Sequence, residues 1–352
     1  MKFGPVPLDQ ALGAVLAHSA RAAEPPYDGG RSYRIAKGTR LGPQHIADLR
    51  AEGVGMITVA RLDPGDVDEN AAALALARAL VPEPAAQGLH LAAAGAGRVN
   101  LVADHAGIVA LDAARLAALN LVDPMITVAT LAPFARVAAE AMVATIKIIA
   151  YAVPQAALAA ACAQACAPAG GAIRLCPPVY ASASLIETAI GRDTPPDKGR
   201  RVTQARLARF GLALTDRVVV AHDAGAIATA LRAAPGEVLL ILTASATSDA
   251  RDTAPEGLRA AGGRLIRFGM PVDPGNLLFL GMLDQKPVIG LPGCARSPAM
   301  NGADWVLERV ICGLDITAQD IAAMGVGGLL KEIPTRPRPR RASPVAGSPD
   351  EN

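Results

Sequence analysis

The sequence predicts an α/β fold in which a parallel-sheet domain is preceded by smaller α+β or β-rich domains. Between residues 172 and 312, strand-like and helix-like segments alternate as they do in βαβ units. Residues 237–243 are almost all apolar, which is typical of a central parallel strand buried on both faces. Before residue 170 the pattern changes to short strands separated by turn residues. We therefore expect the main α/β domain in the C-terminal half.

The first 169 residues are expected to form two small domains, an α+β accessory segment over 1–85 and a β-rich or α+β domain over 86–169. The glycine and proline cluster at 168–171 predicts the boundary that follows. Strands are predicted at 35–39, 56–60, 96–103, 107–111 and 125–129. Helices are predicted between Pro43 and Gly53, at 67–80 behind the capping residue Asp66, at 155–166, and at 136–149, where a helix runs into a strand.

The segment 170–333 is predicted to be the α/β domain. Its strands are expected at 173–176, 216–220, 237–243, 265–268 and 287–291. Its helices are expected at 198–210, 224–233, 255–261, 298–312 and 317–324. Residues 334–352 are mostly Pro, Arg and Ser, which predicts a disordered tail.

Composition excludes several classes of protein. The net charge of +2 creates no global field toward nucleic acid or a membrane surface. The longest apolar stretch, residues 141–153, contains Lys147 and is shorter than the roughly 20 residues that span a bilayer. No secretion signal opens the chain. We expect a cytoplasmic protein with neither a nucleic-acid nor a membrane partner.

Several common catalytic and metal-binding patterns are missing from the sequence. The five cysteines form no paired spacing, and no two of the five histidines stand three or four residues apart, so neither disulfides nor zinc are expected. No G-x-S-x-G is present, and no G-x-G-x-x-G follows a strand. His222 follows a predicted strand, where it is either a contact of a ligand site or a loop residue beside a helix cap.

Three loops that follow predicted strands could carry chemistry, because open parallel sheets bind ligands at the carboxyl ends of their strands. The loop 243–248 contains only small and hydroxyl residues, which let backbone amides approach an anion. The loop 270–276 contains two prolines and a glycine, and the loop 291–295 has the sequence Leu-Pro-Gly-Cys-Ala. Each alone is compatible with an ordinary connection, but together the three would line one edge of the sheet.

The order of these loops resembles the molybdopterin-binding domain that molybdopterin adenylyltransferases share with molybdopterin molybdenumtransferases. The usual motifs of that domain are Gly-Gly-Thr/Val-Gly/Ser, Arg-Asp-x-Thr-Pro-Glu, Pro-Gly-Lys-Pro and Leu-Pro-Gly-Asn-Pro. The resemblance covers about 140 residues and implies a three-layer, parallel-sheet molybdopterin-binding domain. The residues implied as ligand contacts are Thr188, Ser245, Ala246, Thr247, Ser248, Arg251, Glu256, Pro274, Gly275, Pro292 and Gly293. Asp252 is implied both as the catalytic residue and as a ligand of Mg²⁺.

The chain departs from these motifs at several positions. Ser245 and Ala246 stand where the family has paired glycines, and Asn276 stands where it has a lysine. The Asn-Pro of the last motif is Cys294-Ala295, and the acidic Gly-Asp-Glu-Leu is missing, with Glu187 or Asp193 as the nearest acid. A lost glycine restricts the loop backbone, and a lost lysine removes a charge that would meet phosphate.

The N-terminal part is similar to the accessory region of molybdenumtransferases in Lys37-Gly38-Thr39 and in the segment 49–59. The stretches 97–101 and 144–149 resemble proteins in which such a binding domain precedes a nucleotidyltransferase domain. The chain therefore resembles the stand-alone form of that binding region, which is not fused to a nucleotidyltransferase domain.

Two functions follow from the resemblance. The first is that of a molybdopterin molybdenumtransferase-like enzyme, which inserts molybdate into adenylylated molybdopterin with Mg²⁺ and releases AMP. The alternative is a non-catalytic module that holds molybdopterin or the mature cofactor and delivers it to a molybdenum cofactor nucleotidyltransferase or a molybdoenzyme. The sequence leaves the oligomeric state open, including a homo-oligomer.

Overall fold

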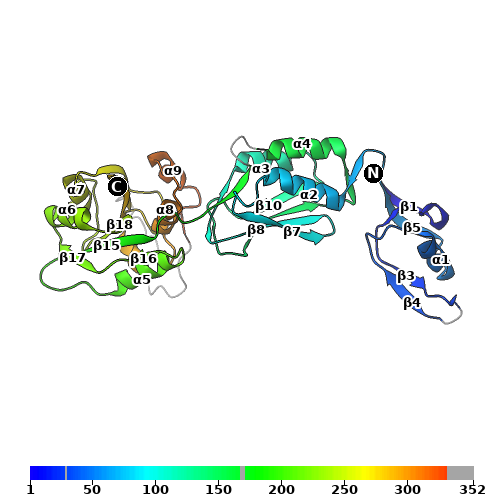
Figure 1. The fold of residues 1–352 in the computed structure, drawn as a ribbon, viewed down its shortest axis with the longest axis horizontal. Helices are drawn as coiled ribbons and strands as arrows, with labels where there is room; N and C mark the ends of the chain where they lie inside the picture. Colours follow the sequence, from blue (N-terminus) through cyan, green and yellow to red (C-terminus); the bar gives the residue numbers. More distant parts are fainter. Residues whose placement is uncertain (28–29, 167–170, 331–352) are drawn as a thin grey trace, which may run out of the picture. The chain divides into compact units, whose positions relative to one another are not determined.

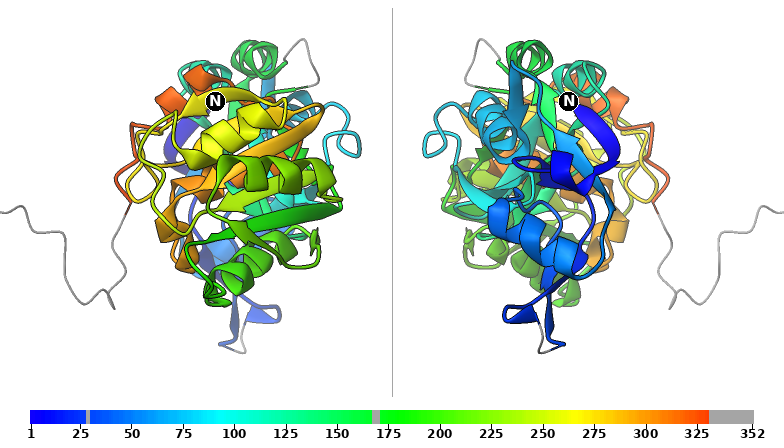
Figure 2. Two further views of the ribbon diagram at one scale, coloured as in Figure 1. Left: turned by 90° about the vertical axis from the view of Figure 1, so that its left-hand side faces the viewer. Right: turned by 90° about the vertical axis from the view of Figure 1, so that its right-hand side faces the viewer.

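The computed structural model describes residues 1–27, 30–166 and 171–330 of the chain, which divides into two compact units, Met1–Pro177 and Pro178–Asn352 (Figures 1 and 2). Most of the predicted boundary at 168–171 and all of the predicted tail at 334–352 lie outside the described residues. The further division of residues 1–169 at position 85 stays a prediction. Within the described ranges, no helix has both the length and the apolarity needed to cross a membrane.

The first 61 residues form a small α+β assembly. Its elements are β1 (Lys2–Pro7), the 3-10 turn η1 (Leu8–Gln10), β2 (Val15–Leu16), β3 (Ala20–Ala23), β4 (Ser32–Ile35), α1 (Pro43–Ala51) and β5 (Met56–Arg61). The strands β1, β5 and β2 make an antiparallel sheet, and β3 and β4 form a hairpin. The hydroxyls of Tyr27 and Tyr33 donate to the buried Asp48 carboxylate of α1 at 2.9 and 2.6 Å, so they tie the hairpin region to this helix.

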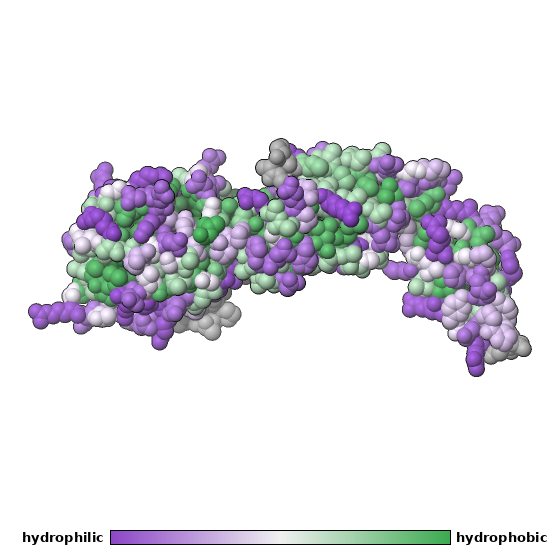
Figure 3. Space-filling model, in the orientation of Figure 1, coloured by the Kyte–Doolittle hydropathy of each residue, from purple (hydrophilic) through white to green (hydrophobic). Residues whose placement is uncertain are grey.

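The rest of the first unit is built on a four-stranded antiparallel sheet, ordered β10-β12-β8-β7. Its elements are β6 (Asp66–Asp68), α2 (Glu69–Leu80), β7 (Leu89–Gly95), β8 (Arg98–Ala103), β9 (Gly107–Leu111), α3 (Ala113–Asn120), β10 (Ile126–Thr130), β11 (Arg136–Val137), β12 (Met142–Ile148), β13 (Ala152–Pro154), α4 (Gln155–Ala165) and β14 (Ile173–Cys176). Helices α2, α3 and α4 share one apolar core with the sheet. Helix α4 carries no charged residue, and its outer surface is accordingly apolar (Figure 3).

Two predictions about this unit were wrong. The helix expected from residue 136 is instead the short strand β11 followed by a turn and the longer strand β12. The strand β14 was expected to open the parallel domain, but it pairs antiparallel with β9 in the first unit. The reason is that a short apolar strand shows no preference for its partner, and here the partner lies more than 60 residues earlier in the chain.

The second unit contains a seven-stranded sheet with the order β16-β15-β18-β21-β20-β19, in which β17 also pairs with β15. Its strands are β15 (Ser182–Ala189), β16 (Ala213–Leu214), β17 (Val218–Ala221), β18 (Val238–Leu242), β19 (Arg264–Phe268), β20 (Phe279–Leu283) and β21 (Lys286–Leu291). Its helices are α5 (Lys198–Ala208), α6 (Ala224–Ala233), α7 (Thr253–Ala260), the 3-10 turn η3 (Gly293–Arg296), α8 (Gly302–Ile311) and α9 (Ala318–Ala323).

Helices pack on both faces of this sheet. Leu239 and Ile241 of β18 belong to the apolar core under α6 and α7, which lie side by side (Figure 2). Leu242 points to the other face, where it contacts the start of α5 at Gly199. Because successive strand residues alternate in direction, β18 is buried on both sides, as its apolar sequence predicted.

The sheet of the second unit is mixed, which corrects the expectation of an all-parallel domain. The strands β15, β16, β17, β18 and β21 are parallel to one another, whereas β20 is antiparallel to both β21 and β19. The strand β20, which a tight hairpin at Asp284, with φ of 52°, joins to β21, was not predicted from the sequence. Nor was the central strand β15, because its small and polar residues hide its buried position.

A substitution at Gly290 tests the packing in this hairpin, because Gly290 lies directly opposite Phe279. A Cβ atom at Gly290 would come within 1.9 Å of the Phe279 ring. We expect Gly290→Ala to lower the free energy of unfolding by about 1–3 kcal/mol, the usual cost of overpacking. Urea denaturation followed by the fluorescence of Trp305, the single tryptophan, measures this in the second unit. The loss should shrink in a Phe279→Leu background, and equal losses in both backgrounds would contradict the contact.

Candidate functional site

The carboxyl ends of five strands meet at one edge of the second unit's sheet. The strands β15, β17, β18 and β21 run parallel, and β19 shares their direction because both β19 and β21 are antiparallel to β20. The three predicted loops, 243–248, 270–276 and 291–295, therefore leave the sheet at this carboxyl edge. This is the edge at which ligands bind in open α/β sheets.

A buried hydroxyl joins three strand ends at the carboxyl edge. Thr188, at the end of β15, accepts a hydrogen bond from the Ala244 amide at 2.8 Å and lies 2.9 Å from Nδ1 of His222. Since the amide is the donor in the first contact, the Thr188 hydroxyl proton is free to donate to His222 Nδ1. In the tautomer in which Nδ1 accepts from Thr188, Nε2–H of the half-buried His222 would be a further donor at this edge.

The loop 243–248 presents backbone amides that the fold does not use. Within the described ranges, the amides of Ser245, Ala246, Thr247 and Gly293 have no hydrogen-bond acceptor, and the Cys294 amide meets only the thiol of its own residue. Ser245, Ala246, Gly293 and Cys294 are also exposed. Successive free amides with small side chains form the kind of concave donor surface that accepts phosphate or carboxylate groups.

Arg296 adds a positive charge beside this loop. Its guanidinium donates to the Thr243 carbonyl at 2.6 Å, which links the segment after β21 to the end of β18. The side chain passes over Gly199 at the start of α5, where an added Cβ would lie 3.4 Å from Arg296 Cγ. Free amides and a guanidinium therefore meet at the carboxyl edge, and this combination favours an anionic ligand.

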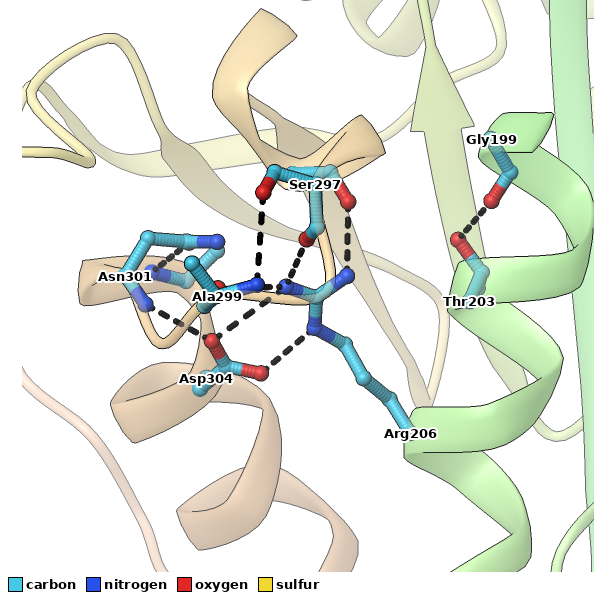
Figure 4. Close-up of polar contacts among 9 residues, drawn as sticks. Gly199, Thr203, Arg206, Ser297, Ala299, Asn301 and Asp304 are labelled. Carbon is cyan, nitrogen blue, oxygen red and sulfur yellow. Dashed lines mark hydrogen bonds and ion pairs between the residues drawn. The ribbon is translucent and has the colours of Figure 1, made fainter. Parts of the chain in front are cut away.

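A second, buried arginine fixes the segment that carries Arg296 (Figure 4). Arg206 of α5 donates to the carbonyls of Ala295, Ser297 and Ala299 at 2.6, 2.8 and 3.2 Å. Its Nε also donates to Asp304 at 2.5 Å, so the buried charge has a buried partner. Apart from the short 3-10 turn η3, the segment after β21 is held by this Arg206 network.

The turn at Pro274 and Gly275 packs against the end of the same segment. The Gly302 amide, at the start of α8, donates to the Pro274 carbonyl at 2.8 Å. Gly275 has a φ of 143°, and a Cβ atom there would come within 2.7 Å of the Gly302 nitrogen. A glycine is therefore required at this position by both the backbone conformation and the close approach.

Asp252 begins helix α7 as its N-cap. Its carboxylate accepts hydrogen bonds from the amides of Ser248 at 2.9 Å and Thr253 at 2.6 Å. The hydrogen bond from Ser248 is the largest cause that lowers the pKa of Asp252, against the opposing effect of partial burial, and His222 lowers it further. Asp252 thus has a structural role in addition to the role that the sequence predicts.

Of the other ligand contacts predicted near α7, one already has a partner within the protein. Glu256 forms an ion pair with Arg259 at 2.5 Å, and Arg251 is exposed. Of the acids considered as substitutes for the missing motif, Glu187 is buried and receives two hydrogen bonds from Arg217, at 2.8 and 3.3 Å, whereas Asp193 is exposed. Asp252 is therefore the predicted acid that lies beside the free amides.

The carboxyl edge does not form a metal site from protein groups alone. In the described part of the chain, no cluster of three or more His, Cys, Asp or Glu residues could hold a metal ion. Mg²⁺ is commonly held by one or two carboxylates together with substrate phosphates. Asp252 supplies one carboxylate, so the predicted Mg²⁺ depends on phosphates that a ligand would bring.

Comparisons with known proteins give distant similarities. The model of a domain of unknown function (DUF8806) matches residues 5–61, and no curated protein matches the chain. The molybdopterin biosynthesis MoeA protein from Pyrococcus horikoshii is 14% identical, with 88% of this chain and 75% of that chain covered and a TM-score of 0.29. A structure of a molybdopterin biosynthesis MoeA protein from Pyrococcus horikoshii OT3 is 11% identical, with 93% of this chain and 75% of that chain covered and a TM-score of 0.23. A molybdenum cofactor biosynthesis protein B is 17% identical, with 38% and 95% covered and a TM-score of 0.29. Similarities this weak assign the chain to no family.

The Arg206 network leads to a prediction about stability. Arg206→Met would leave the buried Asp304 carboxylate without its counter-ion, which typically costs about 3–5 kcal/mol. We expect a loss of this size in urea denaturation monitored by Trp305 fluorescence. The control Arg201→Met removes an exposed arginine of the same helix that pairs with Asp197 at 3.6 Å, and it should cost less than about 1 kcal/mol. Equal losses for the two variants would contradict the role of Arg206.

The capping role of Asp252 predicts a dependence on pH. Its folded pKa is lowered, so the stabilisation is present above the ordinary carboxyl pKa of about 3.9 and is lost as the pH falls through the folded value. Asp252→Ala should cost about 0.5–2 kcal/mol at pH 7, as for other N-caps. The gap between wild type and variant should close as the pH is lowered below about 4. A gap that is constant across this range would show that the Asp252 charge is not involved.

Proposed function

We propose that the carboxyl edge of the second unit binds a molybdopterin-type ligand, and that the protein acts in molybdenum cofactor biosynthesis or delivery. The observation that carries the proposal is the group of free amides at Ser245–Thr247 and at Gly293, with Arg296 beside them. A terminal phosphate of a pterin ligand needs this combination of amides and positive charge. The resemblance of the four loop motifs supplies the identity of the ligand.

Further polar groups at this edge suit the pterin part of the ligand. Nε2–H of His222 is a donor, while the Asp252 carboxylate retains lone pairs beyond its two amide contacts. A pterin ring edge carries both N–H donors and ring acceptors, so it can use both groups. A phosphate alone would be repelled by Asp252, which favours a ligand with its ring edge toward Asp252 and its phosphate toward Arg296.

The enzymatic form of this function is molybdate insertion into adenylylated molybdopterin, with release of AMP. In this form Asp252 would hold Mg²⁺ that the nucleotide phosphates bring, so the cation would separate the carboxylate from the phosphates. The protein's own contribution is to bind and orient the phosphorylated pterin on the amides and Arg296, and to hold its ring edge at His222.

The carrier form is favoured by a separate observation. The Asp252 carboxylate already caps α7 through Ser248 and Thr253, and Glu256, the second acid of that motif, is paired with Arg259. A carrier needs the binding surface but no catalytic carboxylate. In this form the protein holds molybdopterin or the mature cofactor for a nucleotidyltransferase or a molybdoenzyme.

Titration calorimetry with molybdopterin tests the binding site. Arg296→Gln removes the charge and should weaken binding by about 10–100-fold, as expected for a lost charge-assisted hydrogen bond. The matched control Arg209→Gln, at an exposed arginine at the end of α5, should bind like wild type. Binding that is unchanged in Arg296→Gln, or absent in wild type, would refute the proposed site.

Release of AMP from adenylylated molybdopterin and molybdate distinguishes the two forms. An enzyme should release AMP in the wild type and lose this activity in Asp252→Asn, while the variant retains much of its binding. A carrier should bind the pterin without releasing AMP. Circular dichroism of the variant at the same temperature shows whether it is folded.

A further inference from the structure

A cavity of about 140 Å³ lies at the end of the second unit's sheet opposite the carboxyl edge. Pro287, at the beginning of β21, and Val310, at the end of α8, both line it. Its position follows from the order of the strands, because β20 and β19 extend the sheet beyond β21, the strand that α8 contacts. On the face beside α8, Ile266 and Met282 are accordingly only half-buried, whereas Leu280 is buried.

The floor of this cavity is apolar. Leu280 and Met282 of β20 alternate with core residues of the opposite face, so both point toward the α8 side. Ile266 of β19 completes the floor, and the buried Val310 and Ile316 form part of the wall. A space of about 150 Å³ holds benzene when its lining is wholly apolar, so the apolar floor of this pocket has room for one apolar group of similar size.

Three polar side chains border the cavity without using their hydrogen-bonding groups. Arg264 and Asp315 are exposed, and Tyr180 is half-buried. Among the described residues, none of these side chains has a hydrogen bond or an ion pair, and Arg264 and Asp315 do not pair with each other. The cavity thus has a cation, an anion and a hydroxyl around an apolar floor.

We propose that this cavity binds a small zwitterion with an apolar side chain, of which a hydrophobic amino acid is the common biological example. A purely anionic ligand would face Asp315, and a purely cationic ligand would face Arg264. A ligand with both charges places its carboxylate at Arg264 and Tyr180 and its ammonium at Asp315. Its side chain replaces water over Leu280, Ile266 and Met282. The site shares no residue with the carboxyl edge, so it is independent of the proposed function.

Titration calorimetry of the full chain with L-leucine and L-phenylalanine tests the proposal. We expect binding of at least one of them at about 10 mM, where a ligand with a Kd of about 1 mM fills most sites. Two analogues of leucine serve as controls, 4-methylpentanoate without the ammonium and 3-methylbutylamine without the carboxylate. Each should bind at least about tenfold more weakly, a difference of about 1.4 kcal/mol.

Variants locate the binding. Arg264→Gln and Asp315→Asn should each weaken it at least about tenfold, and Met282→Trp should abolish it by filling the cavity. The controls Arg209→Gln and Asp216→Asn, at exposed positions away from the cavity, should leave binding unchanged. Absence of binding by both amino acids overturns the proposal. Binding that survives both Arg264→Gln and Asp315→Asn also overturns it. Because Arg264 and Asp315 are exposed, these two variants should fold, so this outcome can be read even if Met282→Trp does not fold.

Discussion

The buried guanidinium of Arg206 determines the shape of the carboxyl edge. Its donors gather the carbonyls of Ala295, Ser297 and Ala299, while Asp304 neutralises its charge. Without such an anchor, a segment with a single 3-10 turn would have many conformations of similar energy. Arg296 lies between two of the anchored carbonyls, so the same network places the charge that meets Thr243. Asp304 also accepts from the Asn301 amide at 2.8 Å, so the network sets the start of α8, against which the Pro274 turn packs.

The elements that the sequence predicted best are those whose pattern is local. Helix α6 was predicted at its observed bounds, because Asp223 caps it and its apolar residues recur at helical spacing. The strand β15 escaped prediction because its burial depends on distant partners. Glu187 of that strand is buried, and Arg217, thirty residues later, neutralises its charge. In the sequence alone, an acid argues against a buried strand, because the distant arginine that neutralises its charge cannot be recognised.

The candidate site was predictable in its backbone but not in its side chains. Small residues after a buried strand predicted exposed amides in the loop 243–248, and the structure has three amides there without an acceptor in its described ranges. The roles of Arg296 and His222 depend on contacts with Thr243 and Thr188, which belong to other strands. No local spacing encodes such contacts, because they arise from the order of strands in the sheet.

The departures from the family motifs have physical counterparts in the structure. Ser245 and Ala246 replace glycines, yet neither adopts a positive φ, so the loop needs no glycine for its backbone conformation. Their side chains are small enough to leave the amides exposed. The missing lysine is the exposed Asn276, but Arg296 on the neighbouring segment brings a positive charge to the same edge. Under the proposed function, the charge that faces the ligand has moved from one loop to another. The absence of one motif residue therefore does not by itself imply that binding is lost. Loss of both the positive charge and the amide donors at that edge would imply it.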